Sequence, residues 1–233
     1  MKKLGAFLAG VGLLASATFA ADSNTASSVN IVGFNKIDCP RGKSVLVNSA
    51  FESIEGNTLY TVDVLGTNLP PGTVVSYFVS TGIPGYKKVD NYSEIDIDVY
   101  GWSSNVTYKG SMGFWITVPP GAASSNYVVV LAGQVPLSQK TTNVVQNGYN
   151  LLGYPYTASV LWTDTELAKN ALPGDVVSVF NPVSGYKSYN YSEVDIDVYS
   201  WGAATNLVIT PGMGFWYVTA TARTNLEVRP YNP

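Results

Sequence analysis

The sequence predicts an all-β fold made of two tandem β-sandwich or barrel-like repeats, with one short helix in the second repeat. The stretch Tyr-Ser-Glu-Ile-Asp-Ile-Asp-Val-Tyr-Gly-Trp at residues 92–102 returns almost unchanged at residues 191–201. Short apolar segments bounded by Gly and Pro recur at the spacing of roughly 8–12 residues that sandwiches and barrels show. Charged residues make up only 12% of the chain, which contains 16 tyrosines, a composition typical of exported β proteins.

The first 20 residues have the features of a secretory signal peptide. A basic start at Lys2 and Lys3 precedes a short apolar run, and the small residue Ala20 closes the segment. The apolar run is shorter than the roughly 18 residues that a membrane-spanning helix needs. We therefore expect cleavage near Ala20, a secreted or cell-surface location, and no transmembrane segment in the mature chain.

The chain after the signal peptide divides at matching landmarks. Residues 21–41 form an N-terminal segment with a first strand, residues 42–137 form the first repeat, and residues 138–233 form the second. Pro-Gly turns lead into apolar strands at 71–78 and 173–180, and Gly-Phe-Trp core strands start at 113 and 214. The apolar segment 127–133 reads as a fully buried strand that joins the repeats. Segment 22–37 precedes the repeat frame, so we expect it to be free to reach into a neighbouring copy.

The helix is predicted from its end signals. Thr163 to Glu166 fit a capping box, Leu167, Ala168 and Leu172 supply an apolar side, and Pro173-Gly174 stops the helix. The corresponding residues 57–69 of the first repeat carry a weaker helical pattern.

Composition argues against several classes of function. The chain has no histidine, which removes the commonest general base and zinc ligand, and it has no Gly-x-Ser-x-Gly elbow, so we expect neither an enzyme nor a bound cofactor. The formal net charge of −3 does not suit nucleic acid. Cys39 is the single cysteine and excludes an internal disulfide. We expect it to be a small buried residue, with a cross-link between copies as the alternative.

The duplicated stretch is the candidate functional feature. Read as a regular strand, it places the aliphatic residues of each copy on a core face and the acids and aromatics on the other. Calcium is one interpretation of the acids, although alternate residues about 6.6–7 Å apart on one flat strand cannot surround an ion. The metal candidates are Glu94, Asp96, Asp98, Glu193, Asp195 and Asp197.

Two other interpretations of the same face remain open. The acids can form a solvated strip that protects a strand from edge-to-edge aggregation. Alternatively, the aromatic rings can cover sugar faces while the carboxylates accept hydrogen bonds from sugar hydroxyls. The candidate glycan ligands are Tyr92, Tyr100, Trp102, Tyr191, Tyr199 and Trp201.

Three motifs resemble a group of secreted, two-repeat bacterial β proteins whose function is uncharacterised. They are Asn-Ile-Val-Gly-Phe-Asn at 30–35, Gly-Tyr-Asn-Leu-Leu-Gly-Tyr-Pro at 148–155 and Gly-Met-Gly-Phe-Trp at 212–216. They are similar to the "G-W/Y-N-L-I … G-W … G-K-G-F/Y-W" pattern of that group. The resemblance covers most of the mature chain and implies export, tandem β domains and a surface or matrix role. It implies no catalytic residue, and the acidic stretches are not part of the pattern.

These features together predict an exported structural protein that self-associates. We expect a homopolymer, in the form of a cell-surface layer, an extracellular filament or a matrix, built by contacts between strand edges or faces. The alternative is a surface carbohydrate-binding module or adhesin that binds polysaccharide through the aromatic and acidic faces.

Overall fold

The computed structural model describes residues 32–53, 59–104 and 106–232, so the predicted signal peptide lies outside the described residues. The fold is all-β, as the sequence predicts, and every strand pair is antiparallel. Strands β1 to β9 form one half of the molecule, and β10 to β19 form the other.

Within the described ranges, the first half contains nine strands and one helix. They are β1 (Val32–Pro40), β2 (Ser44–Asn48), β3 (Leu59–Tyr60), α1 (Thr61–Leu65), β4 (Val74–Val79), β5 (Gly85–Asp96), β6 (Val99–Trp102), β7 (Thr107–Tyr108), β8 (Gly113–Thr117) and β9 (Asn126–Gln134). The main sheet has the order β2-β8-β4-β5-β6, β1 pairs with β9, and β3 pairs with β7.

The second half has a closely related arrangement. Its elements are β10 (Lys140–Val145), β11 (Gly148–Gly153), β12 (Val160–Leu161), η1 (Trp162–Asp164), α2 (Glu166–Lys169), β13 (Val176–Asn181), β14 (Gly185–Asn190), β15 (Ser192–Asp195), β16 (Val198–Ser200), η2 (Gly202–Asn206), β17 (Val208–Ile209), β18 (Gly214–Thr219) and β19 (Arg223–Val228). The main sheet has the order β11-β18-β13-β14, and β10–β19, β12–β17 and β15–β16 form separate pairs.

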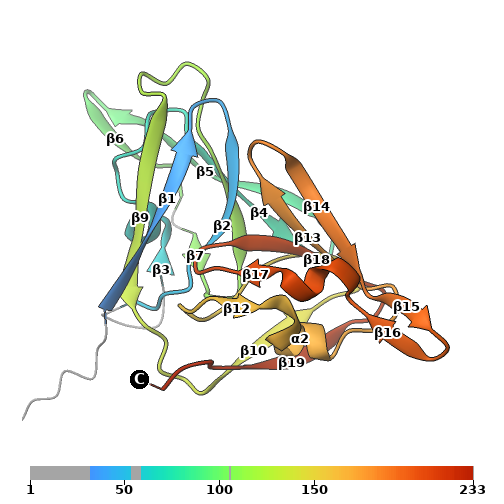
Figure 1. The fold of residues 1–233 in the computed structure, drawn as a ribbon. Coiled ribbons are helices and arrows are strands. Elements are labelled where there is room, and N and C mark those ends of the chain that lie inside the picture. Colours follow the sequence, from blue (N-terminus) through green and yellow to red (C-terminus); the bar gives the residue numbers. More distant parts are fainter. Residues whose placement is uncertain (1–31, 54–58, 105, 233) are drawn as a thin grey trace, which may run out of the picture.

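Successive side chains of a strand point to opposite faces, so each main sheet makes a different packing contact on each of its two faces. One face of the first sheet, which includes Val75, Phe114 and Ile116, packs on the core of its own half beneath the β1–β9 ribbon. The second sheet buries Val177, Phe215 and Tyr217 in the same way. Figure 1 shows the β1–β9 ribbon at the left and the β10–β19 ribbon along the bottom, with the main sheets between them. Each half is therefore sandwich-like.

The opposite faces of the two sheets pack against each other. Leu46 and Trp115 from the first half meet Leu151 and Trp216 from the second in one buried cluster, with Phe78 and Phe180 against it. The contacts are reciprocal, because Leu46 pairs with Trp115 across its sheet just as Leu151 pairs with Trp216. Isolated bridges join Val47 to Met213 and Met112 to Leu152. The halves therefore meet as the subunits of a two-fold dimer do, each with the same surface.

Several predicted elements differ in the structure. Strand β1 pairs with β9 along its whole length, so residues 32–37 already have a partner in their own chain, whereas residues 22–31 lie outside the described residues. Strand β9 is not fully buried, since it alternates between inward residues and the exposed Val128 and Val130. The half-buried alternation follows from its place in a two-stranded ribbon with one face in water.

The helix prediction is correct in place and inexact in its bounds. Helix α2 begins after the N-cap Thr165, whose Oγ1 accepts a hydrogen bond from Ala168 N at 3.1 Å, so the cap is two residues later than predicted. Leu172 lies beyond the helix and is exposed. The first half also contains a helix, the five-residue α1, where the sequence pattern is weaker. Cys39 is buried, as predicted.

The contact between the halves requires glycine at the starts of β8 and β18. A Cβ added to Gly214 would lie 2.7 Å from Val47 O, and one added to Gly113 would lie 2.6 Å from Leu152 O. Both clashes are with backbone atoms, which cannot turn aside as a side chain can. We predict that Gly214→Ala destabilises the protein by about 1–3 kcal/mol, the usual cost of overpacking, measured by urea unfolding.

Gly121→Ala is the matched control for this substitution. A Cβ on Gly121 would have no atom within 4 Å, and its backbone is not in the left-handed region. Equal stability of the two variants would contradict the proposed close approach of the halves.

Candidate interaction surfaces

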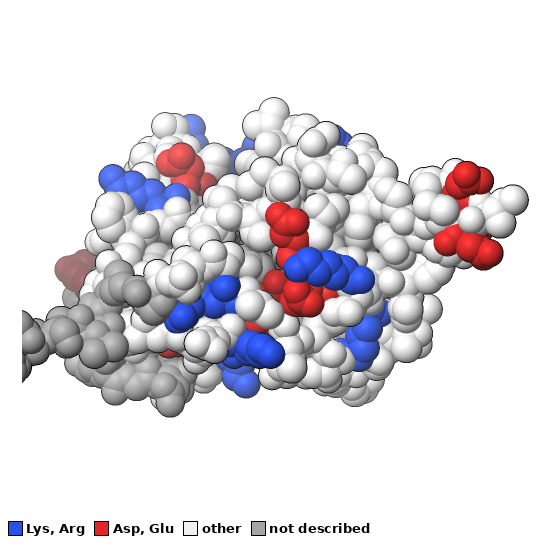
Figure 2. Space-filling model, turned by 60° about the horizontal axis from the view of Figure 1, so that its bottom comes forward, with Lys and Arg blue, Asp and Glu red and all other residues white. Residues whose placement is uncertain are grey.

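Two projecting hairpin tips, residues 94–99 and 193–198, contain the duplicated acidic stretch. Their cross-strand pairs correspond, with Glu94 opposite Tyr100 and Asp96 opposite Val99 in the first tip, and the equivalent pairs in the second. Figure 2 shows the second tip projecting at the right with its acidic groups at the end. Both tips are formed by the outer strands of their halves, beyond the packed cores.

The acidic side chains stabilise the turns. Asp96 Oδ1 accepts a hydrogen bond from Ile97 N at 2.8 Å, and Glu94 Oε1 accepts one from Asp98 N at 3.1 Å. The same two bonds recur in the second tip with the same lengths. Asp98 and Asp197 have φ of 58° and 57°, a left-handed conformation that Asp tolerates better than most residues. The turn geometry is therefore one physical reason for acids in a strand sequence.

The aliphatic residues of the tips are exposed, and the prediction that they form a core face is wrong. Ile97 is 85% exposed and its counterpart Ile196 is 83% exposed. A register shift between Glu94 and Asp96 interrupts the alternation, and the core clusters of the described residues include none of residues 94–99. The remaining exposed aliphatic residues of the tips are Ile95, Val99, Val194 and Val198.

The aromatic residues predicted for a sugar surface are largely buried at the hairpin bases. Tyr92 is 5% exposed and Trp201 is 4% exposed, while Trp102 and Tyr191 pack against the cores. Their polar atoms bind backbone carbonyls: Tyr92 Oη donates to Thr67 O at 2.7 Å. Trp201 Nε1 donates to Ala168 O at 3.1 Å. Tyr100 and Tyr199 are exposed, and Trp102 and Tyr191 are half-buried. Sugar binding by these residues stays a prediction.

The predicted calcium ligands do not converge within one chain. In the described part of the chain, no three acidic or cysteine side chains are grouped so that they could hold a metal ion. Glu94 and Asp96 each use an oxygen in the turn, and their counterparts Glu193 and Asp195 do the same. A calcium ion shared between copies of the chain stays a prediction.

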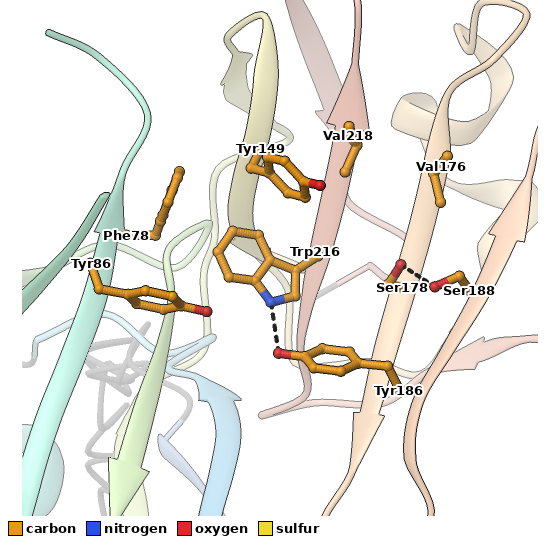
Figure 3. A pocket seen from close by; sticks show the side chains of 9 residues that line it. All are labelled: Phe78, Tyr86, Tyr149, Val176, Ser178, Tyr186, Ser188, Trp216 and Val218. Carbon is orange, nitrogen blue, oxygen red and sulfur yellow. Dashed lines mark hydrogen bonds between the residues drawn. The ribbon is translucent and has the colours of Figure 1, made fainter. Parts of the chain in front are cut away.

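A second surface, which the sequence analysis did not predict, is an aromatic groove between the halves. It has a volume of about 660 Å³. Its lining residues are Phe78, Tyr86, Tyr149, Val176, Ser178, Tyr186, Ser188, Trp216 and Val218. Figure 3 shows Phe78 and Tyr86 of the first half facing Trp216 and Tyr186 of the second across the groove.

Aromatic packing holds the groove in shape. The Phe78 and Trp216 rings pack edge to face with their centroids 4.9 Å apart, and the Tyr149 and Trp216 rings do so with their centroids 5.9 Å apart. Trp216 Nε1 donates a hydrogen bond to Tyr186 Oη at 3.2 Å. Edge-to-face pairs of this kind add about 0.5–1.5 kcal/mol each beyond the area they bury. The groove is therefore a preformed, mostly apolar surface with hydroxyl groups at its rim.

A smaller mirror groove lies over the first sheet and shows how the two halves differ. Its volume is about 320 Å³, and its lining residues are Ser44, Ser76, Tyr86, Trp115, Thr117 and Phe180. The Trp115 and Phe180 rings pack at 4.8 Å, which matches the Trp216–Phe78 contact. In the first sheet Ser44 lies opposite Thr117, and at the equivalent positions of the second sheet Tyr149 lies opposite Val218. Tyr149 thus adds an aromatic wall that the mirror groove lacks.

Tyr86 lines both grooves. Burial raises the pKa of Tyr86, and the neighbouring Tyr186 raises it further, while the Trp115 N–H acts in the opposite direction. Trp115 Nε1 is nevertheless buried without an acceptor of hydrogen-bond geometry among the described residues, unlike Trp216 Nε1. Tyr86 therefore remains a neutral hydroxyl group at physiological pH.

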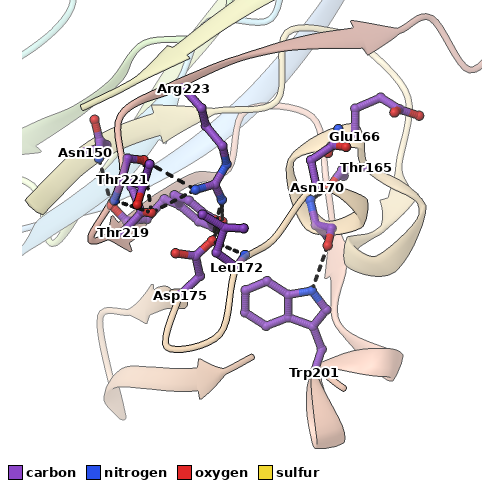
Figure 4. Close-up of polar contacts among 12 residues, drawn as sticks. Asn150, Thr165, Glu166, Asn170, Leu172, Asp175, Trp201, Thr219, Thr221 and Arg223 are labelled. Atoms are coloured by element: carbon purple, nitrogen blue, oxygen red, sulfur yellow. Dashed lines mark hydrogen bonds and ion pairs between the residues drawn. The ribbon is translucent and has the colours of Figure 1, made fainter. Parts of the chain in front are cut away.

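The last strand of the second half buries polar side chains where the last strand of the first half buries apolar ones. The inward residues of β9 include Val129 and Leu131, whereas those of β19 are Asn225 and Glu227. A buried network joins Asp175 to Arg223 and to Tyr217, whose Oη donates to Asp175 Oδ2 at 2.6 Å. Figure 4 shows the arginine reaching both Asp175 and the Thr219–Thr221 turn.

The pKa of Asp175 and that of Glu227 shift in opposite directions. Burial alone would raise the pKa of Asp175, but hydrogen bonds from Leu172 N, Tyr217, Thr219 and Arg223 outweigh it and lower the pKa. Glu227 is 2% exposed, and burial raises its pKa to about 7, with the Glu166 charge adding to the effect. Its Oε1 accepts a hydrogen bond from Glu166 N at 3.0 Å, while Oε2 has no partner among the described residues.

Comparisons with known proteins identify no relative. No family model matches the chain, and no curated protein and no solved structure gives a match. The resemblance noted in the sequence therefore stays a prediction. Within the described ranges, no helix has the length and apolar character needed to cross a membrane.

Glu227 gives a prediction about stability and pH. The pKa of Glu227 is about 7 in the folded chain, against the ordinary value of 4.5. Its contribution to the free energy of unfolding is therefore fully present below pH 4.5. This contribution falls as the pH rises and is lost above about pH 7, because the unfolded chain releases the proton at lower pH than the folded chain does. We predict that this loss is about 3 kcal/mol. Glu227→Gln cannot titrate, and it should remove this part of the decline in urea-unfolding free energy between pH 4.5 and 8.

The matched control is Glu193→Gln on the exposed second tip, which should keep the pH dependence of the natural chain. A Glu227→Gln variant whose stability declines with pH as steeply as the natural chain would show that another group titrates.

Proposed function

We propose that the chain is an exported, non-enzymatic structural protein that self-assembles into a surface layer, filament or matrix through its two hairpin tips. The observation that carries this proposal is the pair of equivalent projecting tips, each with strongly exposed aliphatic side chains. Large exposed apolar groups that project together are characteristic of contact surfaces.

The energetics favour burial of the tips in a contact. Each fully buried Ile or Val side chain contributes about 1.5–3 kcal/mol relative to its exposed state. Each tip presents three such residues, in a turn that hydrogen bonds already hold in place. A prepared turn loses little conformational entropy when it binds, so more of the burial energy is available for association.

The number of contact sites on each molecule also supports assembly. One tip belongs to each half, so a single chain has two sites that can engage other copies. Two contacts per subunit are sufficient to extend a chain of subunits, and contacts between unlike surfaces produce open filaments when the rotation does not close.

Substitution of the tip residues tests the proposal. We predict that the double variant Ile97→Asp and Ile196→Asp raises the critical concentration for assembly at least tenfold, because a carboxylate replaces the most exposed apolar group of each tip. Negative-stain microscopy and sedimentation of the mature chain would measure this. Each single variant keeps one working tip, so its critical concentration should lie between those of the natural chain and the double variant.

Val183→Asp is the control, because Val183 is 93% exposed in a different turn. It should assemble like the natural chain. Single particles of the natural chain at all concentrations would contradict the proposal directly.

Calcium gives a separate prediction. Because Glu94 and Asp96 already bind backbone N–H groups within the turn, we expect ordered assemblies to persist in a chelator. Order that disappears in chelator and returns with added Ca²⁺ would instead place the ion between carboxylates of neighbouring copies, and the same microscopy distinguishes the two results.

A further inference from the structure

We infer that the aromatic groove between the halves is the receiving site for the hairpin tip of a second copy of this chain. This inference rests on the proposed self-assembly and identifies the surface that the tips bind. The groove and the tips are two apolar features that are left without a covering element in the described part of the chain.

The first argument is that the groove cannot be filled by a tip of its own chain. Ile97 and Ile196 are both more than four-fifths exposed, so neither tip is seated in a groove. Figure 1 shows the β15–β16 hairpin projecting away from β13 and β18, the strands that form the groove floor. A tip can enter the groove only from another molecule.

The second argument is chemical complementarity. The tip presents aliphatic side chains flanked by carboxylates, which only accept hydrogen bonds when ionised. The groove is apolar at its centre and contains hydroxyl donors, with no acidic side chain among its lining residues. The tyrosines are Tyr86, Tyr149 and Tyr186, and the serines are Ser178 and Ser188. Aliphatic groups would therefore meet aromatic rings while the carboxylates meet hydroxyl donors and no like charge.

The third argument is size and shape. A groove of about 660 Å³ falls in the range of clefts that bury a drug-sized ligand, which is comparable with the apolar end of a hairpin. The mirror groove has about half that volume and lacks the Tyr149 wall. The geometry thus favours one of the two related grooves, so each copy offers one strong receiving site.

A charge placed on the groove floor tests this assignment. Ser178 lies on the floor and is partly exposed, so Ser178→Asp should fold normally, but its carboxylate would repel the acidic tip. We predict at least a tenfold rise in the critical concentration for assembly, with an unchanged melting temperature. Tyr149→Ser, which copies the mirror groove, should also weaken assembly. Ser76→Asp in the mirror groove is the matched control and should assemble normally.

A cross-link gives a direct test of the docked geometry. The double variant Ser178→Cys and Ile196→Cys should form disulfide-linked ladders between copies under mild oxidation, whereas Ser76→Cys with Ile196→Cys should not. Cys39 does not compete, because it is buried and burial, together with the Asp38 charge, raises its pKa to about 12. Ladders of equal intensity in both double variants would overturn the assignment to the Tyr149-walled groove.

The outcomes separate this inference from the proposal on which it depends. Loss of assembly in the tip variants with normal assembly of Ser178→Asp would overturn the groove as the receiving site and leave tip-driven assembly intact. Single particles of the natural chain would overturn both. A soluble polysaccharide that changes tryptophan fluorescence in the natural chain but not in Ser178→Asp, when Ser178→Asp still assembles, would make the groove a glycan site and overturn the inference.

Discussion

The close backbone approach of the two halves at Gly113 and Gly214 determines much of this structure. It brings the starts of β8 and β18 against the opposite sheet and places Trp115 and Trp216 side by side in the shared cluster. The two halves present equivalent surfaces to each other, so equivalent residues form both sides of the contact. The aromatic groove is a by-product of this packing, because its walls come from different halves.

The two halves have similar strand arrangements but different cores. The first half has an apolar layer between its sheet and its ribbon, whereas the second half has the Asp175–Arg223 pair and Glu227 at inward positions. Buried polar groups cost free energy unless they are fully paired, and Glu227 Oε2 has no hydrogen-bond partner among the described residues. Glu227 of the second half is therefore a buried carboxyl group that links the stability of the fold to pH.

The sequence was sufficient to predict the features that depend on local pattern. The all-β class, the buried Gly-Phe-Trp strands, the place of α2 and the burial of Cys39 all follow from composition, turns and capping. The orientation of the tips could not be predicted, because a bulge after Glu94 interrupts the two-residue period. Tyr92 and Trp102 bind carbonyls near α1 that are remote in sequence, and the groove joins residues from both halves. The local sequence signal for the groove was the repeated Gly-Tyr-Lys at 85–87 and 185–187, because it contains two of the tyrosines that line the groove.

The exchange of Ser44 for Tyr149 at equivalent sheet positions has a consequence for architecture. A perfectly two-fold subunit has no direction, and a row of such subunits looks the same from either end. Here one side of the molecule has a large aromatic groove and the other a small one. The subunit therefore has a head and a tail, and any linear array that uses this difference grows with a defined polarity.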